Sequence, residues 1–311
     1  TIVSFTDIYG NSELDGFTIR DSYSDSDVSI RGGGIYISNS SYSSYSCDPV
    51  IRNCWITNNV SNFGSGLSIT QTASPTIEHC VISGNSGNDD SMGGAIYIKG
   101  DTKACMPRFD YCTIVGNTTT AGGAIYADAS VADKTHITVL NSIIWNNSRT
   151  GSEIKLLNEA NMTISNSIVT NSPSSDWNDN FGTDGGNNRS TDPQLVSIPD
   201  TLIAPTATGD CTPLFNSTCI EAGDASYTYD EVTNHHCGWK TDIGGIEYTG
   251  NRMSLPINGP GEYIFGGNVR MKVNVTVDNL DSLDIIVHPG EHHPQDATTV
   301  DRWYYVRPVG T

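Results

Sequence analysis

The sequence predicts an all-β protein: a parallel β-helix of about six to seven coils, followed by a small, incomplete antiparallel β-sandwich. Three observations predict this. A pair of motifs returns about every 29 residues between Gly32 and Ser172, apolar residues alternate with polar ones inside each copy, and the repeats give way to longer alternating strands near residue 250. A repeat of this length is typical of solenoids, and alternation with a period of two indicates strands.

The first motif of each pair is a glycine-led apolar step. It occurs as Gly-Gly-Ile-Tyr at 33–36, Ser-Gly-Leu-Ser at 65–68, Gly-Gly-Ala-Ile-Tyr at 93–97 and 122–126, and as a degenerate Ser-Glu-Ile at 152–154. The intervals along the series Ile35, Leu67, Ile96, Ile125 and Ile154 are 32, 29, 29 and 29 residues. Glycine before the strand supplies the unusual backbone angles that a tight corner needs.

The second motif is a cysteine or serine followed, two residues later, by isoleucine or valine. Its copies are Asn53–Ile56, His79–Ile82, Tyr111–Ile114, Asn141–Ile144 and Asn166–Val169, and three positions before each Cys or Ser stand Ile51, Ile77, Phe109, Val139 and Ile164. The strands repeat in one direction once per coil, and the sequence shows no helical segment long enough for a crossover. Equivalent strands must therefore pair in parallel, about 4.8 Å apart.

Two columns of equivalent residues point to a structural ladder inside the solenoid. Asparagine follows the isoleucine by three residues at Asn59, Asn85, Asn117 and Asn147, where side-chain amides can hydrogen-bond from coil to coil. Cys54, Cys80 and Cys112 share another inward column, where a ladder of buried thiols is favoured. Adjacent cysteines of this column are close enough for one disulfide, which is the alternative. The same columns extend back to Leu14, Phe17 and Ile19, which are expected to point inward.

The repeats carry a family resemblance. Gly-Gly-Ala-Ile-Tyr at 93 and 122, each paired with an Ile-x-x-Asn step, resembles the repeats of secreted right-handed parallel β-helix surface proteins, including the polymorphic outer-membrane protein class. That class usually has Phe where this chain has Ile56, Ile82, Ile114 and Ile144, so the match is to the wider superfamily. Segments 191–195, 219–224 and 241–247 resemble the terminal segment of such bacterial surface proteins. The resemblance implies architecture more than chemistry, because this fold carries lyases, hydrolases, adhesins and structural proteins alike.

The chain is expected to divide into two parts. Residues 1–250 form the β-helix, with an irregular terminal segment over about 173–250, and residues 251–311 form the sandwich-like domain. Four alternating strands are predicted in the second part, at 262–265, 269–275, 283–287 and 300–306. An immunoglobulin-like sandwich needs about seven strands. Either the natural chain is longer, or a neighbouring subunit supplies the missing strands.

Composition favours a secreted, extracellular or cell-surface protein. The formal charge is −19 although only 16 % of residues are charged, so acidic groups on a surface rich in Ser, Thr, Asn and Gly supply solubility. This charge disfavours nucleic acid as a partner. No apolar run approaches the ~20 residues that span a membrane. Because the chain begins with Thr1, a signal peptide has been removed or the chain is a segment.

Cysteines and glycosylation sequons agree with export. Cys47 and Cys105 share a column but lie two coils apart, about 10 Å, so each needs a loop partner or another chain to form a disulfide. One disulfide is expected among Cys211, Cys219 and Cys237. Six sequons are glycosylation candidates, with loop sites such as Asn39 and Asn188 favoured over the ladder positions: Asn39, Asn146, Asn161, Asn188, Asn216 and Asn274.

The open strand at the start of the chain drives the main functional prediction. Residues 1–9 alternate as a bare strand with no capping helix, and such an edge can add to the incomplete sandwich of another copy. The alternative is that this strand is only the first coil of a longer β-helix. The residues expected at this contact are Ile2, Val3, Phe5, Ile8, Trp303 and Tyr305. Head-to-tail contacts of this kind build fibres. The sequence thus predicts a self-associating structural or adhesive protein and no enzyme, catalytic residue or cofactor-binding residue.

The alternative is a β-helix that binds or degrades polysaccharide, with surface glycans as partners. Arg52, Glu78 and Asp110 fall in one outward column that could hold a sugar or a cation, although an exposed pair of small energetic value is the favoured interpretation. Calcium is the one ion that the sequence suggests, through Asp176, Asn178, Asn180 and Asp184. That segment departs from the EF-hand pattern, with Phe181 at the glycine position, so a polar turn is favoured.

Overall fold

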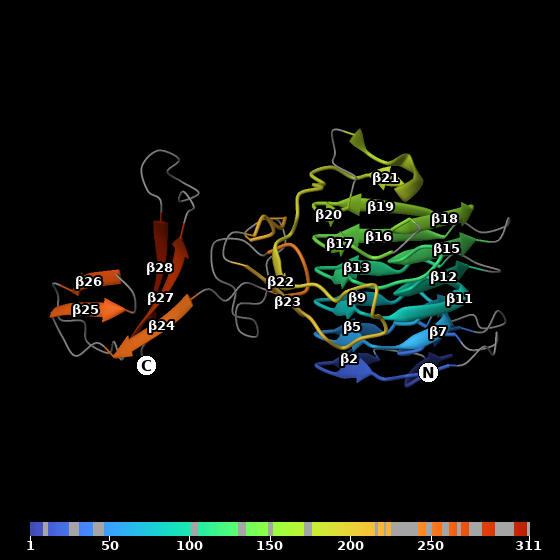
Figure 1. Cartoon of the computed structure of the whole chain (residues 1–311), viewed down its shortest axis with the longest axis horizontal. Helices are drawn as coiled ribbons and strands as arrows, with labels where there is room; N and C mark the ends of the chain where they lie inside the picture. Colours follow the sequence, from blue (N-terminus) through green and yellow to red (C-terminus); the bar gives the residue numbers. More distant parts are fainter. Residues whose placement is uncertain are drawn as a thin grey trace.

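The computed structural model describes residues 1–8, 12–24, 31–39, 47–100, 105–129, 135–148, 152–170, 176–214, 217–220, 222–224 and 242–246, and the backbone of five strands between 251 and 309. The predicted parallel β-helix is confirmed (Figure 1). Successive coils each contribute one strand to three parallel sheets, here called A, B and C, which hold six, seven and six strands.

The three sheets follow the chain in order, A then B then C, in every coil. Sheet A contains β1 (Val3–Thr6), β4 (Ile35–Ser38), β8 (Leu67–Thr70), β12 (Ile96–Gly100), β15 (Ile125–Ala129) and β18 (Ile154–Asn158). Sheet B contains β2 (Glu13–Asp15), β5 (Val50–Arg52), β9 (Thr76–Glu78), β13 (Arg108–Asp110), β16 (His136–Leu140), β19 (Asn161–Ser165) and β21 (Thr183–Asp184). Sheet C contains β3 (Thr18–Arg20), β6 (Trp55–Thr57), β10 (Val81–Ser83), β14 (Thr113–Val115), β17 (Ile143–Trp145) and β20 (Ile168–Val169). Between C and A, β7 (Val60–Phe63) pairs with β11 (Ser86–Met92).

The register of the sheets follows the repeat. Ile35 pairs with Leu67, which pairs with Ile96, and the same succession links the isoleucines of sheet C. These side chains fill a continuous core and are fully buried. Phe17 corrects one expectation, because its side chain is 57 % exposed. It lies in the first coil, at the corner position that the small Cys54 occupies in the next coil, and no described coil packs on its other side.

The corner between sheets B and C explains the residue that precedes each Cys or Ser. Asn53, His79, Tyr111, Asn141 and Asn166 all adopt the left-handed conformation, with φ between 49° and 52°. Asparagine tolerates this conformation better than most residues. The glycines of the first motif have a second role, because a Cβ on Gly34 would lie 2.7 Å from the carbonyl oxygen of Gly66 in the next coil. At Gly34 and Gly66 the stacked coils approach too closely for a side chain, whereas the equivalent positions of later coils hold Ala95 and Ala124.

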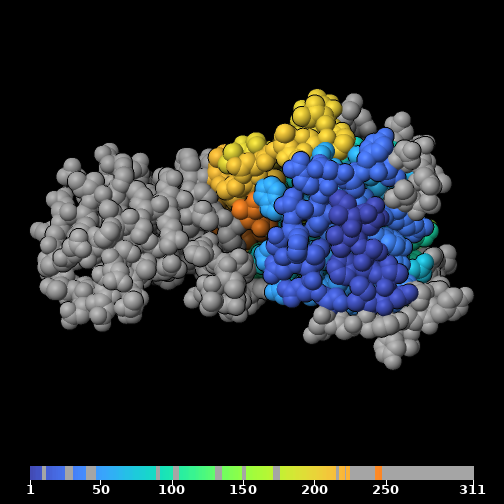
Figure 2. All heavy atoms as spheres, turned by 90° about the horizontal axis from the view of Figure 1, so that it is seen from below, coloured from blue at the N-terminus to red at the C-terminus, as the bar shows by residue number. Residues whose placement is uncertain are grey.

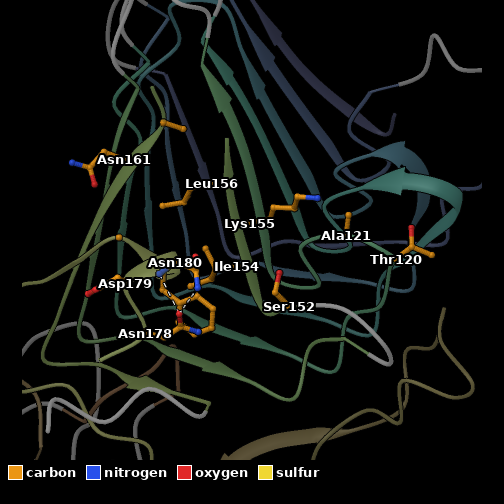
Figure 3. A pocket seen from close by; sticks show the side chains of 13 residues that line it. Thr120, Ala121, Ser152, Ile154, Lys155, Leu156, Asn161, Asn178, Asp179 and Asn180 are labelled. Carbon is orange, nitrogen blue, oxygen red and sulfur yellow. Dashed lines mark hydrogen bonds between the residues drawn. The ribbon is translucent and has the colours of Figure 1, made fainter. Parts of the chain in front are cut away.

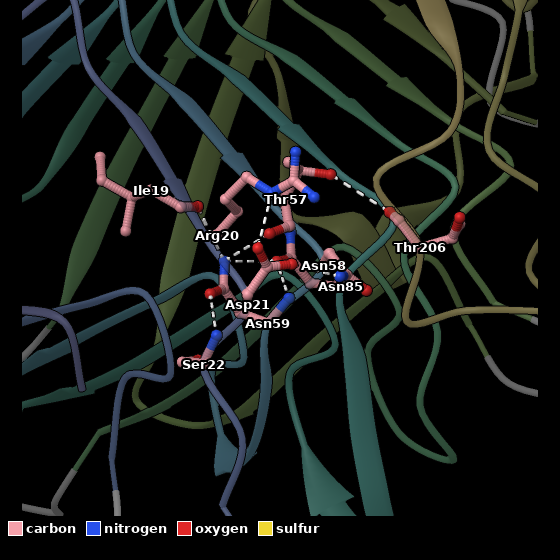
Figure 4. Close-up of polar contacts among 9 residues, drawn as sticks. All are labelled: Ile19, Arg20, Asp21, Ser22, Thr57, Asn58, Asn59, Asn85 and Thr206. Atoms are coloured by element: carbon pink, nitrogen blue, oxygen red, sulfur yellow. Dashed lines mark hydrogen bonds and ion pairs between the residues drawn. The ribbon is translucent and has the colours of Figure 1, made fainter.

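The asparagine column forms a hydrogen-bonded ladder. The backbone N and Nδ2 of Asn59 both donate to Oδ1 of Asn85, Asn85 donates in the same way to Asn117, and Asn117 to Asn147. Figure 4 shows the N-terminal end of the ladder, where Ser22 N donates to Asn59 Oδ1 over 3.1 Å. Each amide also donates to a carbonyl of the preceding coil, so every rung links successive coils.

Glu153 ends the ladder. Its two carboxylate oxygens accept from Asn147 N at 2.9 and 3.1 Å, in the place where another asparagine would stand. Burial raises the pKa of the Glu153 carboxyl, and hydrogen bonds from Asn147 and Thr170 oppose that rise. A carboxylate thus supplies the acceptor that the repeat no longer provides.

A short cap closes the end of the solenoid that follows β20. It consists of residues 176–189, with the 3-10 helix η2 (Asp179–Phe181) and the strand β21, which pairs with β19. Phe181 is part of the main core, and Trp177 Nε1 donates to the carbonyl oxygen of Gly182 over 2.7 Å. The Phe181 side chain, which comes from outside the repeat, thus covers this end of the core.

The segment after the cap covers the outer face of sheet C, which the sequence did not predict. Within it, β22 (Leu195–Ser197) pairs with β23 (Asp210–Pro213). Thr206 N donates to the carbonyl oxygen of Gly84, and Gly244 N to that of Asn141. A second hydrophobic core results, made of Val81, Val115, Ile143, Ile168, Leu195, Cys211, Cys219 and Ile243.

The remaining strands are antiparallel and form two sheets. One has the order β24 (Asn251–Pro256), β27 (Ser282–Pro289), β28 (Arg302–Val309), and the other pairs β25 (Gly261–Phe265) with β26 (Val269–Val273). Four of these strands match the predicted ones, and β24 is additional. Their packing as a sandwich stays a prediction. Trp303 and Tyr305 lie on β28, at an edge of its sheet.

Candidate functional site

A row of charged residues crosses the outer face of sheet B. The parallel register aligns Asp15, Arg52, Glu78 and Asp110 on neighbouring strands. Arg52 forms ion pairs with Glu13, with Asp15 and, over 3.7 Å between Nε and Oε1, with Glu78. The predicted outward column is therefore an ion-pair network that extends beyond Arg52 and Glu78.

Glu78 and Asp110 are neighbouring carboxylates in this row. Asp110 is 2 % exposed, and its Oδ2 accepts from Arg108 Nε over 2.5 Å. Burial raises the pKa of Glu78, Arg52 lowers it, and the nearby Asp110 raises it further. A carboxyl with a raised pKa beside a buried carboxylate is the kind of pair that acid–base chemistry uses.

An aromatic pair adjoins the row at the corner with sheet C. The rings of His79 and Tyr111 stack with centroids 4.9 Å apart and planes 7° apart. Burial lowers the pKa of His79 to about 4, and the charge of Arg52 lowers it as well. The imidazole is therefore neutral at neutral pH. Sequence reasoning missed this pair, although His79 and Tyr111 interrupt a column of asparagines.

The second candidate site is the free edge of the first coil. Among the described residues, β1 pairs only with β4, β2 only with β5 and β3 only with β6. Ile2 is 49 % exposed at this end, Val3 and Ile8 are half-buried, and Phe5 is nearly buried. Figure 2 shows the first coil, in dark blue, uncovered at this face. The four assembly residues predicted in the first strand thus lie in the first coil, which also carries the exposed Phe17.

The third candidate is a pocket of about 700 Å³ at the capped end (Figure 3). Ser152 and residues of β18 line one side, and Asn178, Asp179 and Asn180 of the cap line another. Thr120 and Ala121 complete it from the preceding coil. Because these segments lie outside the repeat columns, the sequence did not bring them together.

The proposed calcium ligands are engaged in local hydrogen bonds. Asn178 Oδ1 accepts from the backbone N and the Nδ2 of Asn180, and Asp184 Oδ1 accepts from Gly186 N and Asn188 Nδ2. Asp176 is exposed. No group of three His, Cys, Asp or Glu residues is placed to hold a metal in the part of the chain that the structure describes. Asp179–Phe181 form the 3-10 helix η2 in this segment, and calcium binding there stays a prediction.

The buried thiol ladder of Cys54, Cys80 and Cys112 is confirmed, and the described cysteines form no disulfide. Cys47, Cys54, Cys80, Cys105, Cys112 and Cys211 are free, buried thiols, and Cys219 Sγ contacts Ser217 Oγ at 2.6 Å. In the ladder column each sulfur donates to backbone carbonyls instead, as Cys80 does to Ile51. Burial raises the pKa of Cys112 to about 12, so this thiol stays neutral. Cys237 lies outside the described residues.

Burial also corrects the preference among the sequons. Asn39 is buried and its Nδ2 donates to Thr72 Oγ1, and Asn188 is buried and its Nδ2 donates to the carbonyl oxygen of Ile164. A glycan on either nitrogen would remove these hydrogen bonds. Asn146 and Asn161 are exposed, and Asn216 and Asn274 lie outside the described residues.

Comparison with known proteins gives one match. A protein-family model described as "Right handed beta helix region" matches residues 6–190, more than half of the chain. Searches of curated proteins and of solved structures returned no match. Across the described residues, none of the helices is long and apolar enough to cross a membrane.

Proposed function

The chain belongs to the right-handed β-helix family, and from this premise we propose that it is an extracellular structural or adhesive protein that self-associates head to tail into fibres. The observation that carries the proposal is the difference between the two ends of the solenoid. The cap closes one end, whereas at the other end each strand of the first coil has a single strand partner among the described residues, and Ile2 and Phe17 are exposed. Free strand edges promote pairing with another chain.

The geometry of β1 supports strand addition. Val3 N and Asp7 N donate to carbonyl oxygens along β4. Backbone groups alternate in direction along a strand, so the N–H groups of Ser4 and Thr6 point to the free side. The acceptor proposed is the outer edge of β28 in another copy, where Trp303 and Tyr305 lie. Strand addition uses such main-chain hydrogen bonds for affinity.

Replacing Ser4 by proline tests this proposal. Proline removes the N–H that faces the free side and is tolerated on an edge strand, so the β1–β4 pairing should survive. We expect the chain to form fibres as its concentration rises, followed by light scattering and negative-stain microscopy, and S4P to raise the concentration needed at least about tenfold. The matched control S4A keeps the N–H and should assemble normally. A chain that stays monomeric, or S4P fibres at the usual concentration, would contradict the proposal.

A second candidate function, polysaccharide cleavage, is favoured by the Glu78–Asp110 pair. Its two carboxyl groups lie on adjacent strands, one with a raised pKa and one held by Arg108. In this role Glu78 would donate a proton to the leaving oxygen while water adds to the other fragment, and the negative charge of the buried Asp110 would help to keep the pKa of Glu78 raised.

This candidate predicts that the protein cleaves a polysaccharide. The substitution E78Q should lower the cleavage rate about 100-fold or more, as expected for loss of a general acid. The control E13Q changes a carboxylate of the same network that has no role in proton transfer. Because the pKa of Glu78 is raised above 4.5, its protonated form persists to higher pH than in an ordinary glutamate. The cleavage rate should fall as rising pH removes this proton. A reducing-end assay over a pH series measures both. Absence of cleavage in a broad polysaccharide panel would remove this candidate.

A further inference from the structure

The pocket at the capped end has a lining with two distinct parts. Leu156 and Ala160, which are half-buried, provide an apolar floor, whereas the side chains of Ile154 and Phe181 are nearly buried in the core. The walls carry amide and hydroxyl groups from Thr120, Ser152, Asn161, Asn178 and Asn180, with Asp179 and Lys155 as the charged groups among the lining residues. A volume of about 700 Å³ is suited to a small ligand.

The cap holds its part of this lining in place. The backbone N and the Nδ2 of Asn180 donate to Asn178 Oδ1 at 3.1 and 2.9 Å, and Trp177 Nε1 donates to the carbonyl oxygen of Gly182. The Trp177 ring meets the Phe181 ring edge-on with centroids 6.5 Å apart. A site whose groups are already ordered loses less conformational entropy when a ligand binds.

We propose that this pocket binds a neutral sugar unit of a glycan. Amides offer both donors and acceptors, which is what a ring of hydroxyl groups requires, and the apolar floor can take the C–H face of the sugar. A purely apolar ligand would leave the amides without partners. A phosphate-bearing ligand would meet Asp179 as well as Lys155. The lining therefore favours an uncharged polyhydroxyl ligand.

This site is independent of fibre formation. The pocket lies at the capped end, whereas the proposed assembly edge belongs to the first coil. S4P should therefore leave sugar binding unchanged, and a failure of one proposal leaves the other standing. In an adhesive protein, the pocket would provide contact with surface glycans.

Saturation-transfer NMR with the full chain and a panel of neutral mono- and disaccharides tests the proposal. The probes are glucose, galactose, mannose, N-acetylglucosamine and their disaccharides, with glucuronic acid as an acidic comparison. We expect binding of at least one neutral sugar, and an affinity loss of roughly tenfold in N161A, the scale of one lost hydrogen bond. The control T163A lies two residues along the same strand, outside the pocket lining. A second variant, A160L, narrows the pocket and should weaken the same sugar.

Three results would overturn the proposal. One is no binding of any neutral sugar. Another is binding of glucuronic acid alone. The third is binding that survives in both N161A and A160L, which would place the sugar elsewhere on the molecule. Circular dichroism of each variant verifies that the fold is intact.

Discussion

Replacing Asn117 by alanine is expected to lower the free energy of unfolding by about 3–5 kcal/mol, because it leaves several buried polar groups without partners at about 1–3 kcal/mol each. Asn117 Nδ2 donates to the carbonyl oxygen of Ile82 and to Asn147 Oδ1, at 2.8 and 2.7 Å. Its Oδ1 accepts from the backbone N and the Nδ2 of Asn85, at 3.0 and 2.9 Å. The substitution opens the ladder in its middle. Urea denaturation followed by circular dichroism measures the loss.

The control for this prediction is the same substitution at an exposed asparagine. N161A removes a side chain on the surface of β19 and should change the free energy of unfolding by less than about 0.5 kcal/mol. N117D keeps the acceptor but loses the donating amide, so it should also be strongly destabilising. If N117A cost less than about 1 kcal/mol, the ladder would contribute little beyond filling space.

The sequence predicted the inside of the solenoid well because each coil packs against copies of itself. In a parallel stack, residues one repeat apart become neighbours, so the columns of Ile35, Asn59 and Cys54 translate directly into contacts between coils. The outward column of Arg52, Glu78 and Asp110 was found for the same reason.

Features outside the repeat could not be found in this way. The pocket joins β18, the loop before β15 and the cap, three segments with no common period. Asn39 and Asn188 are buried by contacts that are specific to each position. The sequence alone therefore wrongly favoured these two sequons as glycosylation sites. Phe17 fits its column, but among the described residues the first coil has a neighbouring coil on one side only.

The sequence contains a pattern that indicates burial of the outer face of sheet C. Outward positions of an exposed sheet are normally polar, yet in this sheet they include Val81, Ile143 and Ile168 beside the inward isoleucines. A strand that is apolar on both faces indicates burial on both. The segment that buries it comes from residues 195–243, outside the repeats.

Replacing Ile143 by alanine is therefore expected to lower the free energy of unfolding by about 2–4 kcal/mol, although the side chain points away from the solenoid interior. Ile143 is 1 % exposed and belongs to the second core with Leu195, Cys211 and Ile243. The comparison is I144A on the same strand. This substitution leaves a cavity in the main core inside the solenoid. Similar losses in urea denaturation would show that both faces of β17 are buried to the same degree.

The control for I143A is T138A, at an outward position of sheet B, which should change the free energy of unfolding by less than about 0.5 kcal/mol. A loss for I143A as small as that for T138A would mean that residues 195–243 do not cover sheet C in solution. A loss near that of I144A would mean that they fold together with the coils. The β-helix would then be stable only with its terminal segment in place, and variants meant to probe assembly or sugar binding would have to retain that segment.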